Sequence, residues 1–264
     1  MTDWLHVGEG AAPLIVSVPH AGTEIPEGIS GLCSAPLARH DADYHVGTLY
    51  AFARDLDATI VETAISRSVI DVNRDPSGAS LYPGQVTTGL CPVETFAGEP
   101  LYAAGAEPDE AEIARRQTHY FDPYHAALQA QIARLRAAHP AVVLYDAHSI
   151  RSHVPRLFAG ELPLFNIGSF GGASCATGLT QAVTAECAGQ SHIINGRFKG
   201  GWITRAYGNP AGGVHAVQME LAIRGYLDED APWPPAWDPA RAADLQITLR
   251  KILDACLTFA KDQK

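Results

Sequence analysis

Short apolar runs alternate along the chain with longer segments of helical periodicity, and this alternation constrains the fold more than any other feature. The runs are mostly rich in β-branched residues, and they cover residues 13–18, 58–63, 69–72, 141–145, 164–168 and 214–221. Between the runs, apolar residues at helical spacing predict helices over residues 43–55, 109–139, 177–188 and 239–261. Strands that alternate with helices predict a three-layer α/β domain, with a central mixed, mostly parallel sheet flanked by helices.

The length of 264 residues suits one large α/β domain, and no shift in composition marks a linker. We therefore expect residues 1–264 to form a single domain. One region, residues 76–108, is rich in Gly, Pro and Thr and has no clear periodicity. Loops of this length are uncommon in compact domains and often form lids or binding loops. This region is expected to be either a lid over a binding site or an irregular excursion packed on the surface.

The charge balance limits the partners of the protein. Its 29 acidic and 19 basic side chains give a formal net charge of -10, without a block rich in Lys or Arg. Nucleic acids and anionic membranes attract proteins mainly through positive charge, so neither is an expected partner. The sequence shows no signal-peptide pattern, no apolar stretch of membrane-spanning length and no CxxC pair among its five cysteines. We expect a cytoplasmic protein with reduced thiols, and the sequence leaves its oligomeric state open.

Polar side chains stand at the ends of four apolar runs, where α/β sheets commonly form ligand sites. His20 follows the first run, and residues 71–75 (DVNRD) close the third. His148 follows the fourth run, and Glu220 lies inside the last one. A buried glutamate is costly unless it is paired or used in chemistry. Two imidazoles and a carboxylate can build a hydrolytic zinc site, so we predict His20 and His148 as metal ligands and Glu220 as the general base.

A catalytic metal site needs a third protein ligand, and residues 39–45 (RHDADYH) are the expected source. Asp41 and His45 are four residues apart, so on a helix both would lie on one face and could reach the same ion. Asp43 would point elsewhere on such a helix, but it could be a ligand if it is the N-cap. Helix capping by Asp41 or Asp43 is the alternative explanation for these carboxylates.

Seven blocks of the sequence, in order from residue 13 to residue 229, resemble the N-formylglutamate amidohydrolase family. The blocks are PLIVSVPHAGTEIP (13–26), DADYHVGTLY (41–50), VIDVNRD (69–75), DAHSIRS (146–152), NIGSFGGASC (166–175), NGRFKGGWITRAYG (195–208) and QMELAIRGYLDE (218–229). The resemblance implies hydrolysis of N-formyl-L-glutamate to formate and L-glutamate, the last step of one route of histidine degradation.

A more distant resemblance, to zinc carboxypeptidases, concerns the mechanism. Those enzymes carry an Asn-Arg pair that binds the substrate carboxylate, a His-Ser that supplies a metal ligand, and a late Glu that acts as base. The chain has similar features in the same order, namely Asn73-Arg74, His148-Ser149 and Glu220. The first ligand motif, His-x-x-Glu, is not matched, because Thr23 stands three residues after His20 and Glu24 comes one place late. The resemblance implies a carboxypeptidase-like fold and a divalent metal, with Zn²⁺ as the expected ion.

The small dicarboxylate substrate that the family resemblance implies would need cationic partners, and arginine binds carboxylates through paired hydrogen bonds. We expect Arg74 with Asn73 to bind one carboxylate and Arg205 or Arg67 to bind the other. Surface or structural ion pairs are the alternative for Arg205 and Arg67. Glu220 would take a proton from water and deliver it to the leaving nitrogen. The alternative functions are another metal-dependent deacylase for N-acylated acidic amino acids and a non-catalytic binding protein for small dicarboxylates.

Overall fold

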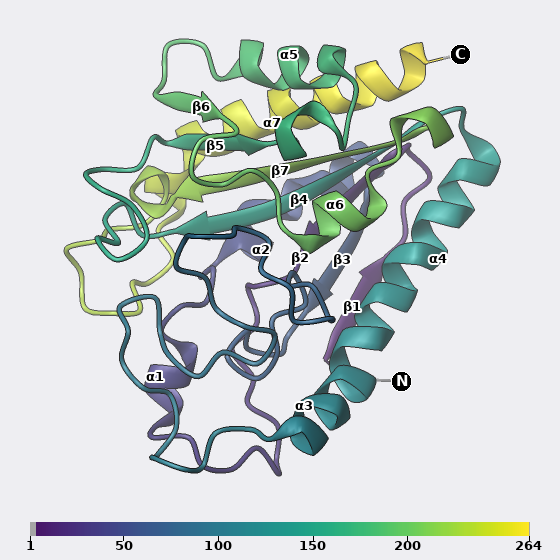
Figure 1. Cartoon of the computed structure of the whole chain (residues 1–264). Coiled ribbons are helices and arrows are strands. Elements are labelled where there is room, and N and C mark those ends of the chain that lie inside the picture. The colour runs from purple at the N-terminus through teal and green to yellow at the C-terminus, as the bar shows by residue number, and fades with distance from the viewer. Residues whose placement is uncertain (1–3, 264) are drawn as a thin grey trace.

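A seven-stranded sheet forms the centre of the computed structural model, which describes residues 4–263 (Figure 1). In sequence order its strands are β1 (Leu5–Gly8), β2 (Leu14–Val18), β3 (Thr59–Thr63), β4 (Val142–Ile150), β5 (Phe165–Gly168), β6 (His192–Ile194) and β7 (Val214–Ala222). Across the sheet the order is β1-β3-β2-β4-β7-β5-β6. The neighbours β3, β2, β4 and β7 run parallel, whereas β1 and β5 pair antiparallel with β3 and β7. The predicted mixed, mostly parallel sheet is confirmed.

The sheet differs from the sequence-based prediction in two respects. Its two edge strands, β1 and β6, are not predicted, because their residues are mostly exposed and form no long apolar run. The strand predicted over residues 69–72 is wrong. Val69, Ile70 and Val72 are buried, but their backbone forms turns and irregular structure. The apolar run there reflects packing in a buried cluster with Phe121 and Tyr124 and not pairing within the sheet.

Helices cover both faces of the sheet (Figure 1). One face packs against α7 (Pro239–Asp262), α5 (Thr177–Glu186) and the short α2 (Val46–Leu49). The other face packs against α4 (Asp122–Ala138) and α6 (Trp202–Tyr207). These layers bury β2, β4 and β7 along their whole length. Burial on both faces explains why β2 and the first half of β4 appear in the sequence as nearly continuous apolar runs, whereas β7 and the second half of β4 also carry buried polar residues.

The remaining helical elements lie around this core. The predicted helix over 109–139 consists of α3 (Glu110–Arg116), a π-helical turn (Gln117–Phe121) and α4. The helix predicted over 43–55 begins only at α2 and continues as a 3₁₀-helix (Ala51–Leu56). A further short helix, α1 (Ala35–Arg39), precedes it. None of the helices within residues 4–263 is both long enough and apolar enough to span a membrane.

Candidate active site

The central parallel strands bring three of the predicted site residues together. His20 lies two residues beyond the end of β2, whereas His148 on β4 and Glu220 on β7 are partners in the parallel register. Their exposed fractions are 2%, 2% and 7%, so all three side chains are buried. Because parallel strands direct their carboxyl ends to one edge of the sheet, residues distant in sequence meet there.

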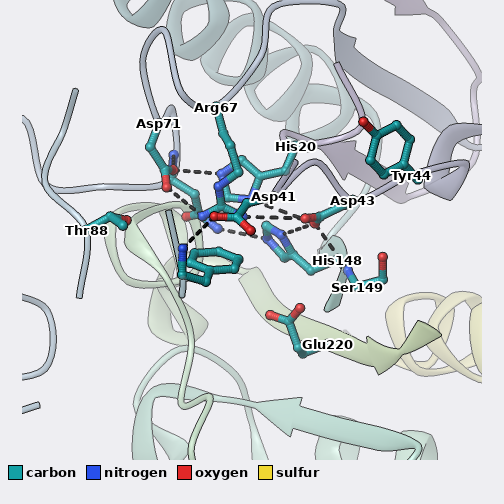
Figure 2. Close-up of polar contacts among 12 residues, drawn as sticks. His20, Asp41, Asp43, Tyr44, Arg67, Asp71, Thr88, His148, Ser149 and Glu220 are labelled. Atoms are coloured by element: carbon teal, nitrogen blue, oxygen red, sulfur yellow. Dashed lines mark hydrogen bonds and ion pairs between the residues drawn. The ribbon is translucent and has the colours of Figure 1, made fainter. Parts of the chain in front are cut away.

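His20, His148 and Asp43 form a compact cluster (Figure 2). Asp43 Oδ2 lies 3.1 Å from His148 Nδ1 and 3.8 Å from His20 Nδ1. One ligand atom from each of the three residues lies within 4.8 Å of the other two. Ligand atoms that are each about 2.1 Å from one tetrahedral ion are about 3.4 Å apart. The spacing of the cluster is therefore compatible with a bound metal ion.

A buried carboxylate orients each imidazole from behind. His20 Nε2 donates to Asp71 Oδ1 at 2.7 Å, and His148 Nε2 lies 2.9 Å from Asp146 Oδ2. Burial opposes ionisation of Asp71, but nearby positive charges, that of Arg74 foremost, hold its pKa well below the ordinary value. With Nε2 directed at a carboxylate, each ring presents Nδ1 to Asp43. Histidines that bind metals commonly have this arrangement.

The donor atoms and their surroundings fit a cation. His20 Nδ1 is buried and has no hydrogen-bond partner among the described residues, although buried polar atoms generally have one. Burial and the charge of Arg67 lower the pKa of His20, which favours the neutral imidazole that a metal ligand must be. At His148, Asp146 and Asp43 outweigh burial and raise the pKa well above its ordinary value. The surroundings of His148 therefore favour positive charge.

Asp43 is held toward the two histidines by its neighbours. Its Oδ2 accepts a hydrogen bond from the Ser149 backbone N–H at 3.1 Å, and its Oδ1 lies 3.4 Å from Arg67 Nη1. The backbone N–H of Asp43 donates to His20 O at 2.9 Å. Arg67 Nη2 also donates to Asp71 Oδ2 at 2.7 Å. One guanidinium therefore links the carboxylate of the cluster to the carboxylate behind His20.

Glu220 lies beside the cluster, and no contact drawn in Figure 2 joins it to the three clustered residues. Among the described residues, its side chain accepts a hydrogen bond from Gln218 Nε2, at 3.3 Å. Burial raises the pKa of Glu220 to about 8, an effect that the charge of His148 partly offsets. A buried carboxyl group with a raised pKa and few fixed partners is suited to proton transfer.

The cluster faces a pocket. His20, His148 and Glu220 line it, and the region over residues 76–108 supplies another wall, which includes Thr88. The region without periodicity therefore lies against the candidate site, as a binding loop would.

The interpretation of Asp41 and His45 as the third ligand is corrected by their positions. Residues 40–45 form no helix, because α2 begins only at Val46, with His45 as its N-cap at a φ of 64°. Asp41 Oδ2 accepts from the Phe96 N–H at 2.6 Å, and His45 Nε2 lies 3.1 Å from a backbone carbonyl oxygen, that of residue 235. Glu24 is exposed and also lies outside the cluster. The four-residue spacing aligns side chains only on a helix, and here a turn directs Asp43 to the histidines instead.

The predicted substrate-binding residues of the third run take different roles. Arg67, Arg74 and Asn73 all line the pocket. The Asn73 amide, however, is fully engaged: Oδ1 accepts from the Ile203 N–H at 2.8 Å, and Nδ2 donates to Asp146 Oδ2 at 2.8 Å. Asn73 therefore supports the carboxylate behind His148, and its amide is not available to a substrate carboxylate.

Arg205, the other predicted carboxylate ligand, does not line this pocket, so its assignment is also corrected. Its Nε donates to Gly200 O at 2.9 Å, and its guanidinium stacks on the Tyr82 ring. Two arginines that the sequence does not assign to the substrate, Arg156 and Arg197, line the pocket instead. They lie on irregular segments, where neither periodicity nor a strand end marks them.

Sequence patterns assign no role to two carboxylates at the site, those of Asp71 and Asp146. Asp146 could have been found, because a residue two positions before His148 on a strand points to the same face. Asp71 is 51 residues from its partner His20. No spacing rule connects them, and only the folded chain shows the pair.

Comparison with known proteins is consistent with this geometry. A family model described as N-formylglutamate amidohydrolase matches residues 12–227. The chain is 44% identical to an N-formylglutamate deformylase of Pseudomonas putida and 42% identical to one of Pseudomonas aeruginosa. Each alignment covers 100% of this chain and 99% of the relative.

Solved structures extend the comparison. An N-formylglutamate amidohydrolase from Ralstonia eutropha superposes with a TM-score of 0.80 at 25% identity, over 98% of both chains. A gene product of Agrobacterium tumefaciens shares the fold, with a TM-score of 0.70 at 21% identity over 97% of this chain and 95% of that one. The family model covers most of the chain, and the Pseudomonas relatives align along its full length. The chain therefore belongs to the N-formylglutamate amidohydrolase family.

Proposed function

We propose that this protein hydrolyses N-formyl-L-glutamate to formate and L-glutamate with the help of one divalent metal ion, Zn²⁺ being the expected ion. His20, Asp43 and His148 would hold the metal. The observation that carries the proposal is the convergence of His20 Nδ1, Asp43 Oδ2 and His148 Nδ1 beside Glu220, in a pocket lined by arginines. The reaction named for the two Pseudomonas relatives supports it. In a cell, this reaction would complete one route of histidine degradation.

The donor set is appropriate for hydrolysis. Two imidazoles and one carboxylate are a common ligand set of catalytic zinc, and they leave a coordination position for water or substrate. When bound, the metal would polarise the formamide carbonyl and lower the pKa of water. Glu220 would accept a proton from the attacking water and deliver it to the amide nitrogen as the C–N bond breaks. Its few fixed partners leave its carboxylate available for both transfers.

Arg74 would bind one of the two substrate carboxylates. Its Nε and Nη2 donate to Thr88 O and Thr88 Oγ1, both at 3.1 Å, which fixes the guanidinium at the pocket wall. Arg67 differs, because its two terminal nitrogens face Asp43 and Asp71. We therefore assign Arg67 to positioning the cluster and not to binding the substrate.

The experiment that tests the function measures both products. The metal-replete protein should release formate and L-glutamate in equal amounts from N-formyl-L-glutamate, and should act far more slowly on N-acetyl-L-glutamate. Faster release of acetate than of formate would favour the alternative deacylase. Binding of N-formyl-L-glutamate without release of either product would instead indicate a binding protein.

A further inference from the structure

Four arginine side chains line the pocket, and they differ in whether a carboxylate of the protein lies close to them. Arg67 pairs with Asp43 and Asp71, and Arg156 pairs with Glu94. Arg74 has Asp71 at 3.6 Å. The fourth, Arg197, forms no ion pair with any residue that the structure describes. A pocket cation without a protein counter-ion is a natural partner for an anionic group of a ligand.

Arg197 is fixed although its charge is unpaired. Its Nε donates to Leu157 O at 2.8 Å and its Nη2 to Val86 O at 2.9 Å, so both bonds go to neutral carbonyl groups. Within residues 4–263, no hydrogen bond from its Nη1 is formed. Burial lowers the pKa of Arg197, and repulsion from Arg74 adds to this effect. Both arginines line the same pocket, and Arg197 has no carboxylate within ion-pair distance among the described residues.

Tyr82 holds Arg197 in this position. The Arg197 guanidinium lies 5.3 Å from the centre of the Tyr82 ring, and that of Arg205 lies 4.9 Å from the same ring. The Tyr82 hydroxyl donates to Gly200 O at 3.0 Å and accepts from the Lys199 N–H at 3.2 Å. A rigid aromatic anchor thus stacks with two arginines, of which only Arg197 lines the pocket.

We propose that Arg197 binds the side-chain carboxylate of the substrate and so selects N-formylated acidic amino acids over neutral ones of the same size. The inference rests on the proposed function and names the residue that sets its substrate class. Arg74 lies next to Asp71, the carboxylate that orients His20, so it suits the α-carboxylate close to the formamide. Arg197 bonds to residues 86 and 157, away from the cluster, and so suits the more distant carboxylate.

The test compares two substrates of nearly equal size, one with a side-chain carboxylate and one with a neutral side-chain amide. We would measure kcat/KM for N-formyl-L-glutamate and N-formyl-L-glutamine with the metal-replete wild type and with the variants Arg197→Gln and Arg205→Gln. A hydrogen-bonded charge is worth about 1.5–3 kcal/mol, so the glutamate-to-glutamine ratio should fall on the order of 10- to 100-fold in Arg197→Gln. Arg205→Gln is the matched control, because Arg205 stacks on the same Tyr82 ring but does not line the pocket. This variant should keep the wild-type glutamate-to-glutamine ratio.

A substrate-independent decrease would overturn the proposal. If Arg197→Gln lowers both kcat/KM values by the same factor, their ratio is unchanged and Arg197 has only a structural role. If the wild type releases no formate at all, the proposed function fails, and binding of glutarate decides the role of Arg197 separately. Calorimetry should then show glutarate binding to Arg197→Gln about 10-fold or more weakly than to wild type, and equal binding would refute the assignment.

Discussion

Replacing Asp71 with asparagine should weaken metal binding without changing any of the proposed ligands. Asp71 is fully buried, and three donors converge on its carboxylate. Oδ1 accepts from His20 Nε2 at 2.7 Å and from the Asn73 N–H at 2.9 Å, while Oδ2 accepts from Arg67 Nη2 at 2.7 Å. An asparagine can place its oxygen on only one of these sides. Its NH₂ group must therefore face a donor, either that of His20 or that of Arg67.

The magnitude follows from this mismatch. If the NH₂ group faces His20, the imidazole loses the acceptor that holds Nε2–H, and Nδ1 is no longer directed at the cluster. If the NH₂ group faces Arg67, the guanidinium loses its ion pair with residue 71, which is shorter than its ion pair with Asp43. Arg67 is then no longer held in place beside Asp43. Substitution of such supporting carboxylates commonly reduces metal affinity by about 10- to 100-fold. We expect a decrease of this size for Asp71→Asn.

Competition with a chromophoric chelator gives the Zn²⁺ dissociation constant of each variant. Asp55→Asn is the control, because it also removes one negative charge, from an exposed carboxylate paired with Arg250 at 2.7 Å. It should bind Zn²⁺ as wild type does. The reasoning is refuted if Asp71→Asn folds with wild-type circular dichroism and also retains the wild-type dissociation constant.

Three further outcomes are expected. Glu220→Gln should lower kcat by about 10²- to 10⁴-fold while keeping Zn²⁺ affinity, because it removes a proton acceptor and no ligand; comparable loss of metal would place Glu220 among the ligands instead. Asp43→Asn should weaken Zn²⁺ binding by more than about 100-fold. Asp41→Asn should leave Zn²⁺ binding unchanged, because the Asp41 carboxylate accepts a hydrogen bond from the Phe96 N–H and lies outside the cluster. Chelator competition measures both affinities, and equal effects of the two substitutions would contradict the assignment of Asp43 as the ligand. Burial lowers the pKa of His125 from 6.5 to about 4, so the unfolded chain binds more protons than the folded one between these values, and the unfolding free energy should fall as the pH drops from 6.5 to 4. In urea unfolding, the loss of unfolding free energy between pH 6.5 and pH 4 should be about 3 kcal/mol smaller for His125→Gln than for wild type. An equal loss in both proteins would be inconsistent with a neutral buried His125.

The layered fold could be predicted because burial of the central strands leaves a direct trace in the sequence. β2, β4 and β7 are buried throughout, and each contains a short, mostly apolar segment. β1 and β6 leave no such trace, since an exposed edge strand needs no apolar residues. The run over residues 69–72 misleads for the opposite reason. It is buried in an apolar cluster, but its backbone lies outside the sheet.

The site shows the same division between sheet and loop. His20, His148 and Glu220 could be placed together because strand ends and parallel register fix them. The position of Asp43 depends on a turn that ends at His45 with a positive φ, and no periodicity describes such a turn. The positions of the pocket arginines depend on contacts between long loops. An example is the contact of Tyr82 with residues 199–200. Sequence patterns alone therefore assign Arg205 to the pocket, whereas the structure places Arg197 there.

The central claim is that a metal held by His20, Asp43 and His148 supports formate release from N-formyl-L-glutamate. Its most direct test is to remove metal with a chelator and then measure the rate of formate release as Zn²⁺ is added back in known equivalents. We predict little release from the chelated protein, a linear rise up to one equivalent, and no further rise beyond it. Full activity in protein shown by elemental analysis to be free of metal would contradict the claim.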